Sequence, residues 1–162
     1  MSQKQQHSKR QFDKAQHTIS SQFSEDRQLR AMLRKHEGVR HLPYCDTVGK
    51  ITIGVGRNLT DRGLAQDEIT LLFENDIKLS TDILDSLFTN WHGFPISARH
   101  ALISMAFNLG GPRLTKFKKM RAALEKHDFL AAAEEAHASL WAQQVPARAA
   151  DVIKMFREAA EA

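Results

Sequence analysis

Residues 37–56 read Glu-Gly-Val-Arg-His-Leu-Pro-Tyr-Cys-Asp-Thr-Val-Gly-Lys-Ile-Thr-Ile-Gly-Val-Gly, and they differ in pattern from the rest of the chain. From residue 44 onward the stretch has β-branched residues, a central glycine and a period close to two, which is typical of strands. We therefore predict a β-hairpin that turns around Gly49. A turn centred there places Asp46 opposite Thr52 on one face and Cys45 on the other face.

Apolar residues at helical spacing dominate on both sides of the hairpin. Ser24 is a candidate N-cap for a first helix, which Gly38 ends. Later helices are predicted over five segments. These are an apolar stripe from Ile69 to Leu87, a helix capped by Ser97 that runs to Leu109 with its stop at Gly110, a short helix with Phe117, Met120 and Leu124, a helix capped by Asp128 that runs to Trp141, and a last helix from Pro146 onward. One small hairpin among many helices predicts an α+β fold that is mostly helical.

Length and composition are those of one globular domain. The chain has 162 residues, of which 42% are hydrophobic and 26% charged. A single cysteine excludes a disulfide framework. Without a long apolar run or an N-terminal signal segment, the chain is expected to be made as a soluble cytoplasmic protein, with no stable membrane insertion.

The positive charge is concentrated near the N-terminus. Residues 1–36 contain eight Lys or Arg against three Asp or Glu, whereas the remainder contains fifteen against sixteen. One interpretation is ordinary solvated charge. The other is that residues 1–23 form a basic polar arm that attracts anionic envelope polymers. A third possibility is that this arm packs on the domain as a helix through Phe12, Ile19 and Phe23.

Two carboxylates in the hairpin region suggest chemistry. Glu37 ends a helix and Asp46 lies nine residues later on a strand. Glycoside hydrolysis needs such a division, because one carboxylic acid protonates the leaving oxygen while a second carboxylate stays ionised. Thr52 could hold the attacking water, since a hydroxyl both donates and accepts. From spacing alone, an ordinary helix end and turn residue remain the alternative.

The same residues resemble the catalytic signature of the T-even phage-type lysozymes, glycoside hydrolase family 24. Glu37 and Asp46 are separated by eight residues and Asp46 and Thr52 by five, as in that family. The resemblance extends over residues 24–162. It includes three further motifs, namely Thr52-Ile53-Gly54-Val55-Gly56, Phe107-Asn108-Leu109-Gly110 and Trp141 through Pro146-Ala147-Arg148.

The resemblance implies roles for these positions. Glu37 would be the general acid, Asp46 would orient or activate the water, and Thr52 would help to hold it. Arg148 would pair with the catalytic glutamate. The family hydrolyses the β-1,4 bond between N-acetylmuramic acid and N-acetylglucosamine with inversion, and uses no cofactor or metal. Sugar contacts are implied for Asn58, Phe107 and Asn108.

The resemblance also implies an architecture. Residues 24–162 would form a lysozyme-like domain with a small lobe over about 38–65 and a helical lobe over about 88–162. A long helix over about 66–87 would join the two lobes. The segment between hairpin and long helix, residues 57–63, is shorter than in the T-even prototype, and Arg57 stands where that prototype has histidine.

The implied context is that of an endolysin. Its partner would be bacterial peptidoglycan, and we expect a monomer that binds no nucleic acid. Made in the host cytoplasm, it would reach the periplasm and cell wall with help from a separate membrane-permeabilising protein. Lysis of the host cell would follow.

Three rival interpretations are weaker. A zinc hydrolase would use His36 and His41, but His-Glu-Gly-Val-Arg-His has one residue too many for the helical zinc motif. Cys45 as a nucleophile lacks the surrounding signature of a cysteine hydrolase. A non-catalytic wall-binding protein would keep the fold without the acid, and the intact Glu37, Asp46 and Thr52 argue against it.

Overall fold

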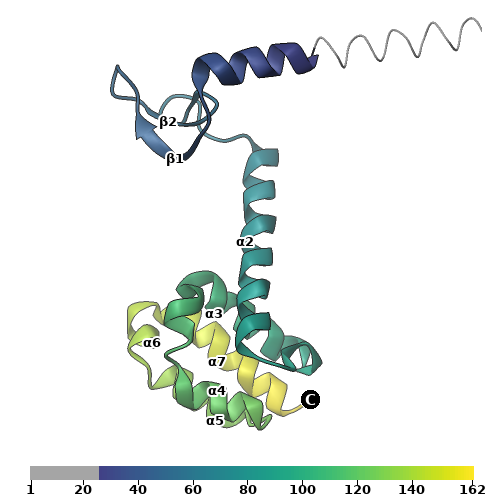
Figure 1. Cartoon of the computed structure of the whole chain (residues 1–162). Coiled ribbons are helices and arrows are strands. Elements are labelled where there is room, and N and C mark those ends of the chain that lie inside the picture. The colour runs from purple at the N-terminus through teal and green to yellow at the C-terminus, as the bar shows by residue number, and fades with distance from the viewer. Residues whose placement is uncertain (1–25) are drawn as a thin grey trace, which may run out of the picture. The chain divides into compact units, whose positions relative to one another are not determined.

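The structure, a computed structural model, describes residues 26–162 (Figure 1). These residues fall into two units that divide between Ala65 and Gln66. The predicted arm over residues 1–23 and the predicted cap at Ser24 lie outside the described residues.

In the first unit, residues 26–37 are helical. Gly38 ends this helix as predicted, because its φ of +73° is one that L-residues with a side chain rarely adopt. The N–H of Gly38 donates to the carbonyl oxygen of Arg34 at 3.0 Å, which satisfies one carbonyl of the last turn. Glu37 is thereby the last helical residue before the chain turns toward the sheet.

Three antiparallel strands follow in the order β1-β2-β3, namely β1 (Arg40–Cys45), β2 (Ile51–Gly54) and β3 (Arg57–Asn58). The predicted hairpin is β1 and β2. The two-residue strand β3 was not predicted, and it pairs Thr52 with Asn58 and Ile53 with Arg57. It arises because the chain turns back at Gly56, whose φ is +70°. The segment predicted only as a connection therefore completes the sheet.

The predicted register of the hairpin was wrong. Thr52 pairs with Tyr44 rather than Asp46, and the N–H of Asp46 donates to the carbonyl oxygen of Lys50 at 2.9 Å. The reason is that Gly49, with φ +80°, is the last residue of a three-residue loop rather than its centre. Since the pairing moves by two, Asp46 and Thr52 remain on one face as diagonal neighbours, and Cys45 lies on the other.

The second unit is entirely helical where it has regular structure. Its elements are α2 (Gln66–Leu87), η1 (Trp91–Gly93), α3 (Ile96–Leu114), α4 (Lys118–Glu125), α5 (Phe129–His137), α6 (Leu140–Gln144) and α7 (Pro146–Ala160). The long helix predicted over 66–87 is α2. Together with the small sheet, these helices confirm the mostly helical α+β fold.

A single apolar core holds the second unit together. Helix α7 packs against both α3 and α5, and α2 packs against α3. The largest side chains with almost no exposure include Leu84, Leu102, Met105, Val152 and Phe156, which come from α2, α3 and α7. Burying each such side chain contributes about 1.5–3 kcal/mol.

Two helix boundaries differ from prediction. Helix α3 begins at Ile96 after Pro95 and makes no side-chain cap, so Ser97 is not its N-cap. Asp128 does cap α5, accepting from the N–H of Ala131 at 2.9 Å, but the helix ends at His137 instead of Trp141. It ends there because Ser139 starts α6 with its own cap.

The predicted stop at Gly110 is a break inside α3. Gly110 has φ +66° and ψ +169°, so helical geometry is interrupted there before the chain continues to Leu114. Pro112 follows within the first turn of the new segment, where its missing N–H costs nothing. None of the helices within residues 26–162 is long and apolar enough to cross a membrane.

Candidate active site

Glu37, Asp46 and Thr52, the three residues predicted to be catalytic, all lie in the first unit. Glu37 ends the helix over 26–37, Asp46 opens the β1–β2 turn, and Thr52 lies in β2. Three different local structures therefore supply one side chain each. Each of these local structures borders or belongs to the sheet.

The Glu37 side chain lies against the β2–β3 turn at Gly56. A Cβ atom at residue 56 would fall 2.9 Å from Glu37 Oε2 and 3.4 Å from its carboxyl carbon. Gly56 also has φ +70°, a conformation that costs any residue with a side chain. Glycine is thus required at this position for two reasons. It adopts the backbone conformation of the turn, and it leaves room for the Glu37 carboxylate.

The Asp46 carboxylate is oriented by the turn that it opens. Its Oδ1 accepts from the N–H of Val48 at 3.0 Å and from the N–H of Lys50 at 2.8 Å. Such bonds from backbone donors to a carboxylate are charge-assisted and stabilise its negative charge. Within the described residues Oδ2 accepts no hydrogen bond, so one carboxylate oxygen is available to a ligand.

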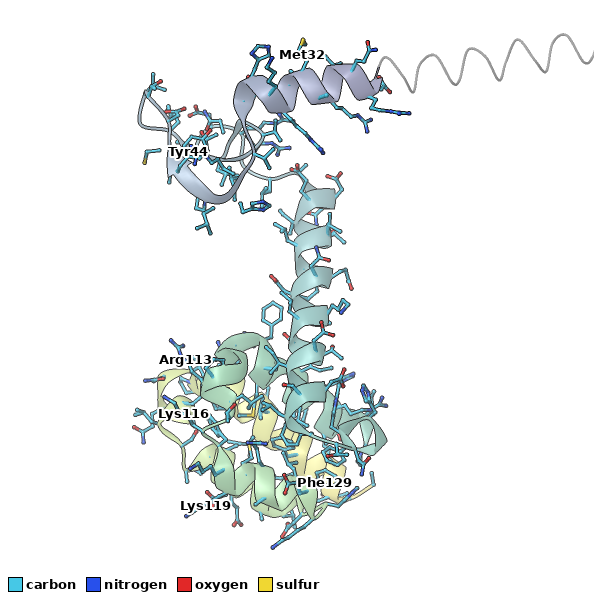
Figure 2. The ribbon with its side chains drawn as sticks, viewed as in Figure 1. Met32, Tyr44, Arg113, Lys116, Lys119 and Phe129 are labelled. Atoms are coloured by element: carbon cyan, nitrogen blue, oxygen red, sulfur yellow. The ribbon has the colours of Figure 1, made fainter. Side chains whose placement is uncertain are left out.

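Thr52 contributes a buried hydroxyl on β2. The residue is only 4% exposed and is flanked by Tyr44 on β1 and Asn58 on β3; Tyr44 is labelled in Figure 2. Its hydroxyl donates to the carbonyl oxygen of Lys50 at 3.4 Å, near the limit of a hydrogen bond. The hydroxyl oxygen can therefore still bind a water molecule.

The two carboxylates stand at opposite ends of β2. Asp46 pairs with Lys50 just before the strand, and Glu37 lies against Gly56 just after it. The two carboxylates are therefore held by different turns, one before this strand and one after it.

Asn58, predicted to contact sugar, is hydrogen-bonded to the loop that follows β3. Its Nδ2 donates to Asp61 Oδ2 at 2.9 Å, and its Oδ1 accepts from the N–H of Asp61 at 2.9 Å. Lys50 Nζ reaches the other oxygen of Asp61 at 2.9 Å. Asn58 is therefore next to Thr52 with its amide committed locally, and its contact with sugar stays a prediction.

Two of the predicted residues meet in the second unit. Arg148 and Phe107 line a cavity of about 330 Å³ between α2, α3 and α7. Arg148 Nη1 donates to Ser104 Oγ at 3.2 Å, and Phe107 stands edge-on to Phe73 with ring centroids 5.9 Å apart. These contacts hold both side chains in place. The predicted pairing of Arg148 with Glu37 stays a prediction.

Asn108 is directed away from that cavity. Its Oδ1 accepts from Trp141 Nε1–H at 2.7 Å, and both residues line a separate groove. Trp141 is 5% exposed, so this hydrogen bond satisfies a donor that is shielded from water. The structure gives Asn108 a structural partner, and its contact with sugar stays a prediction.

The role of Gly56 was missed in the sequence. It is the second glycine of Thr52-Ile53-Gly54-Val55-Gly56, and the repeated glycine was the only signal. The residues of the zinc interpretation are separated by Gly38, with His36 in the helix and His41 in β1. Within residues 26–162, no three His, Cys, Asp or Glu side chains are grouped so that they could hold a metal ion.

Comparison with known proteins identifies the family of this chain. The family described as phage lysozyme matches residues 34–154, which include the whole sheet and all but the end of α7. The chain therefore belongs to the phage lysozyme family, and it is a glycoside hydrolase of the lysozyme type.

Two of its relatives match over most of this chain. The chain is 27% identical to probable T4-type lysozyme 2 of Dictyostelium discoideum over 157 residues, covering 79% of this chain and 92% of that protein. It is 32% identical to the pre-baseplate central spike protein Gp5 of Enterobacteria phage T4 over 149 residues. That match covers 75% of this chain but 26% of the spike protein.

Proposed function

We propose that the protein is a muramidase that hydrolyses the β-1,4 bond between N-acetylmuramic acid and N-acetylglucosamine in bacterial peptidoglycan. The observation that supports this most strongly is the pair of carboxylates near the two ends of β2, together with the buried Thr52 hydroxyl on that strand. Glycosidases require such a pair. The names of the relatives point to the same class of activity.

The proposed reaction divides the work between the carboxylates. Glu37 donates its proton to the glycosidic oxygen as the bond from that oxygen to the anomeric carbon of N-acetylmuramic acid breaks. Water attacks the anomeric carbon from the opposite face and passes a proton to Asp46 Oδ2. Thr52 holds that water. Attack from the opposite face inverts the anomeric configuration, so the first product is the α-anomer.

The positioning contacts suit these roles. Asp46 Oδ1 is held by the N–H groups of Val48 and Lys50, which leaves Oδ2 for the water. Gly56 lets the Glu37 carboxylate lie directly on the turn. A general acid and a general base held in place each contribute about 10²–10⁴-fold to the rate.

Product analysis of digested peptidoglycan tests the proposal. Reducing-end muramic acid identifies a muramidase, whereas anhydromuramic acid would identify a transglycosylase and contradict the proposal. NMR of a short digest shows which anomer forms first. Glu37→Gln should abolish release, while Glu125→Gln, which removes an exposed carboxylate at the end of α4, should not.

A second substitution separates chemistry from folding. Asp46→Asn keeps an oxygen that can accept from Val48 and Lys50 but removes the negative charge. The expected result is a melting temperature close to that of the wild type with activity reduced about 10²–10⁴-fold. Full activity of this variant would remove Asp46 from the mechanism. A wild-type protein that causes no lysis at all would favour the non-catalytic wall-binding alternative.

We further propose that the enzyme acts as an endolysin, made in the host cytoplasm and released to the wall by a separate membrane-permeabilising protein. Its family membership and its phage relative support this context. Expression in the cytoplasm should leave culture turbidity unchanged until the membrane is permeabilised with chloroform. Prompt lysis on expression alone would contradict the dependence on a second protein.

A further inference from the structure

The second unit has a large groove that the proposed reaction does not use. Its volume is about 940 Å³, and it lies between the end of α3, α4 and α6. Four cationic side chains line it, namely Arg113, Lys116, Lys118 and Lys119. Figure 2 shows Arg113, Lys116 and Lys119 on the same side of the helical unit. The catalytic carboxylates belong to the other unit, so this groove is a separate feature.

Cations are concentrated at this groove although the unit as a whole has a small excess of acidic residues. Residues 66–162 hold eleven Lys or Arg and thirteen Asp or Glu, yet residues 113–119 hold four of those cations and no acid. One carboxylate, that of Glu135, lines the groove. It reaches Lys119 Nζ only at 4.0 Å, and the Lys119 side chain is 83% exposed. An exposed pair of this kind contributes little.

The fold presents these cations on a rigid frame. Leu114 and Met120, which bracket most of the basic segment, have 0% and 1% exposure and anchor it in the core. The break at Gly110 redirects the chain so that this segment forms one wall of the groove. Within residues 26–162, Arg113, Lys116 and Lys118 make no ion pair. No acidic side chain of the described residues therefore neutralises their positive charges.

The floor of the groove is apolar. Phe117 stands edge-on to Trp141 with ring centroids 6.2 Å apart, and Leu140 beside them is 67% exposed. A concave apolar floor with convergent polar groups is the usual form of a small-molecule site, and the volume lies in the usual range. The ring of a sugar can lie on such a floor while its charged substituent reaches the rim.

We propose that this groove binds a phosphorylated sugar of the bacterial envelope, with the phosphate on the cations and the ring on the apolar floor. Phosphate suits three unpaired cations better than a carboxylate does, because it carries up to two charges and three acceptor oxygens. Lysine binds phosphate as a point charge. The envelope as the source rests on the proposed function, whereas the binding itself does not.

A second contact of this kind would hold the enzyme near its substrate. Binding at two sites on one envelope makes the second event intramolecular and raises the apparent affinity without a new catalytic contact. The groove is thus expected to lower KM on whole envelopes. It should leave kcat and the activity on a soluble, unphosphorylated oligosaccharide unchanged.

Titration of the full-length protein with N-acetylglucosamine 1-phosphate tests the proposal. Amide signals of residues 113–119 and the indole N–H of Trp141 report binding by NMR. Saturable shifts are expected, with a dissociation constant at least about tenfold lower than for N-acetylglucosamine or inorganic phosphate alone. The absence of saturable shifts, or equal binding of the unphosphorylated sugar, would overturn the proposal.

Charge-removing variants locate the site. Lys116→Gln with Lys119→Gln should weaken binding at least about tenfold. The matched double variant, Lys126→Gln with Lys154→Gln, removes the same charge outside the groove and should not; an equal loss would show general electrostatic attraction and contradict the proposal. Tighter binding of triglutamate or of a short DNA duplex would identify another partner class and overturn it.

The binding test is independent of the proposed reaction. Glu37→Gln should bind N-acetylglucosamine 1-phosphate as the wild type does, because Glu37 lies in the first unit. If the protein binds this probe but does not cleave peptidoglycan, the proposed function fails alone. If it cleaves peptidoglycan but does not bind the probe, only the groove proposal fails.

Discussion

Gly56 combines two constraints that the chain meets with one residue. Its φ of +70° makes the β2–β3 turn, and the missing side chain leaves room for the Glu37 carboxylate 2.9 Å from where a Cβ would stand. Gly54 shares the backbone constraint, with φ +69°, but nothing lies within 4 Å of its Cβ position. Substitutions at the two glycines can therefore be compared to separate backbone strain in the turn from displacement of the Glu37 carboxylate.

Gly56→Ala should impair activity more than it impairs stability. Both Gly56→Ala and Gly54→Ala should cost about 1–2 kcal/mol of unfolding free energy, because alanine disfavours the left-handed region. Only Gly56→Ala should also displace Glu37, and misplacement by about 1 Å can cost about 10²-fold in rate. Urea denaturation and peptidoglycan turnover measure the two effects. Equal activity of the two variants would contradict a positioning role for Gly56.

At the scale of elements, short helices are joined by side-chain hydrogen bonds. Trp141 in α6 donates to Asn108 in α3, and Trp91 in η1 donates to Asp85 in α2 at 2.8 Å. Both indole rings are almost fully buried. A buried donor that loses its partner costs more than the bond itself contributes, so these bonds specify where the helices pack.

Asn108→Ala should destabilise the helical unit. Without the Asn108 oxygen, the Trp141 indole N–H is left without an acceptor, at a cost of about 1–3 kcal/mol. Asn90→Ala is the control, because Asn90 makes no side-chain cap bond at η1. Thermal unfolding measures the difference. If Asn108→Ala keeps its stability but loses affinity for oligosaccharide, the residue binds substrate instead of joining α3 to α6.

Asp85 should make stability depend on acidic pH. The hydrogen bond from Trp91, and next that from His92, lowers the pKa of Asp85 below its ordinary value of 3.8. Because this pKa is lower in the folded than in the unfolded state, the ionised carboxylate stabilises the folded state at pH values above the unfolded-state pKa. This contribution is lost as the pH falls through the folded-state pKa. Unfolding free energy should therefore fall below about pH 4.

Denaturation of Asp85→Asn measures this contribution. The variant should be less stable than the wild type at pH 7, and its stability should decline less between pH 5 and pH 2. Asp82→Asn is the control. It removes a carboxylate of the same helix whose ion-pair partner is the exposed Lys78, so it should change the dependence of stability on pH less. Parallel profiles for wild type and Asp85→Asn would contradict the assignment.

At the scale of the whole molecule, the charge is unevenly distributed. The first 36 residues carry the excess of positive charge, while residues 66–162 are slightly acidic apart from the basic groove. Envelope polymers that bear phosphate would be attracted to both regions. Attraction of this kind acts over about one Debye length, roughly 10 Å at 0.1 M salt and 3 Å at 1 M.

Removal of residues 1–23 should weaken lysis without weakening the fold. These residues carry four Lys or Arg and one Asp. The shortened protein should have a nearly unchanged melting temperature and lower activity on bacterial envelopes at low salt, with the difference vanishing near 1 M salt. Activity on a soluble oligosaccharide is the control. A large drop in melting temperature would instead support a docked helix.

Local chemistry made much of the fold and site predictable. Gly38, Asp128 and Pro146 act on backbone within a few residues, so they marked helix ends correctly. The spacing of Glu37, Asp46 and Thr52 is a short motif, and it identifies the family from the residues alone. Prediction failed where the local sequence did not specify the pairing. At Gly49, a shift of one residue in the centre of the loop changed which residue opposes Thr52.

The sequence by itself determined the class of protein, the positions of the candidate catalytic residues and most element types, because these depend on short-range backbone preferences and on a motif. Tertiary structure alone decided that Gly56 leaves room for Glu37, that Asn108 binds Trp141 and that the basic segment 113–119 lines one groove with residues of α6. Each of these contacts joins residues that are far apart in the chain. Which of them form depends on packing of the whole unit, since no local preference specifies the partner.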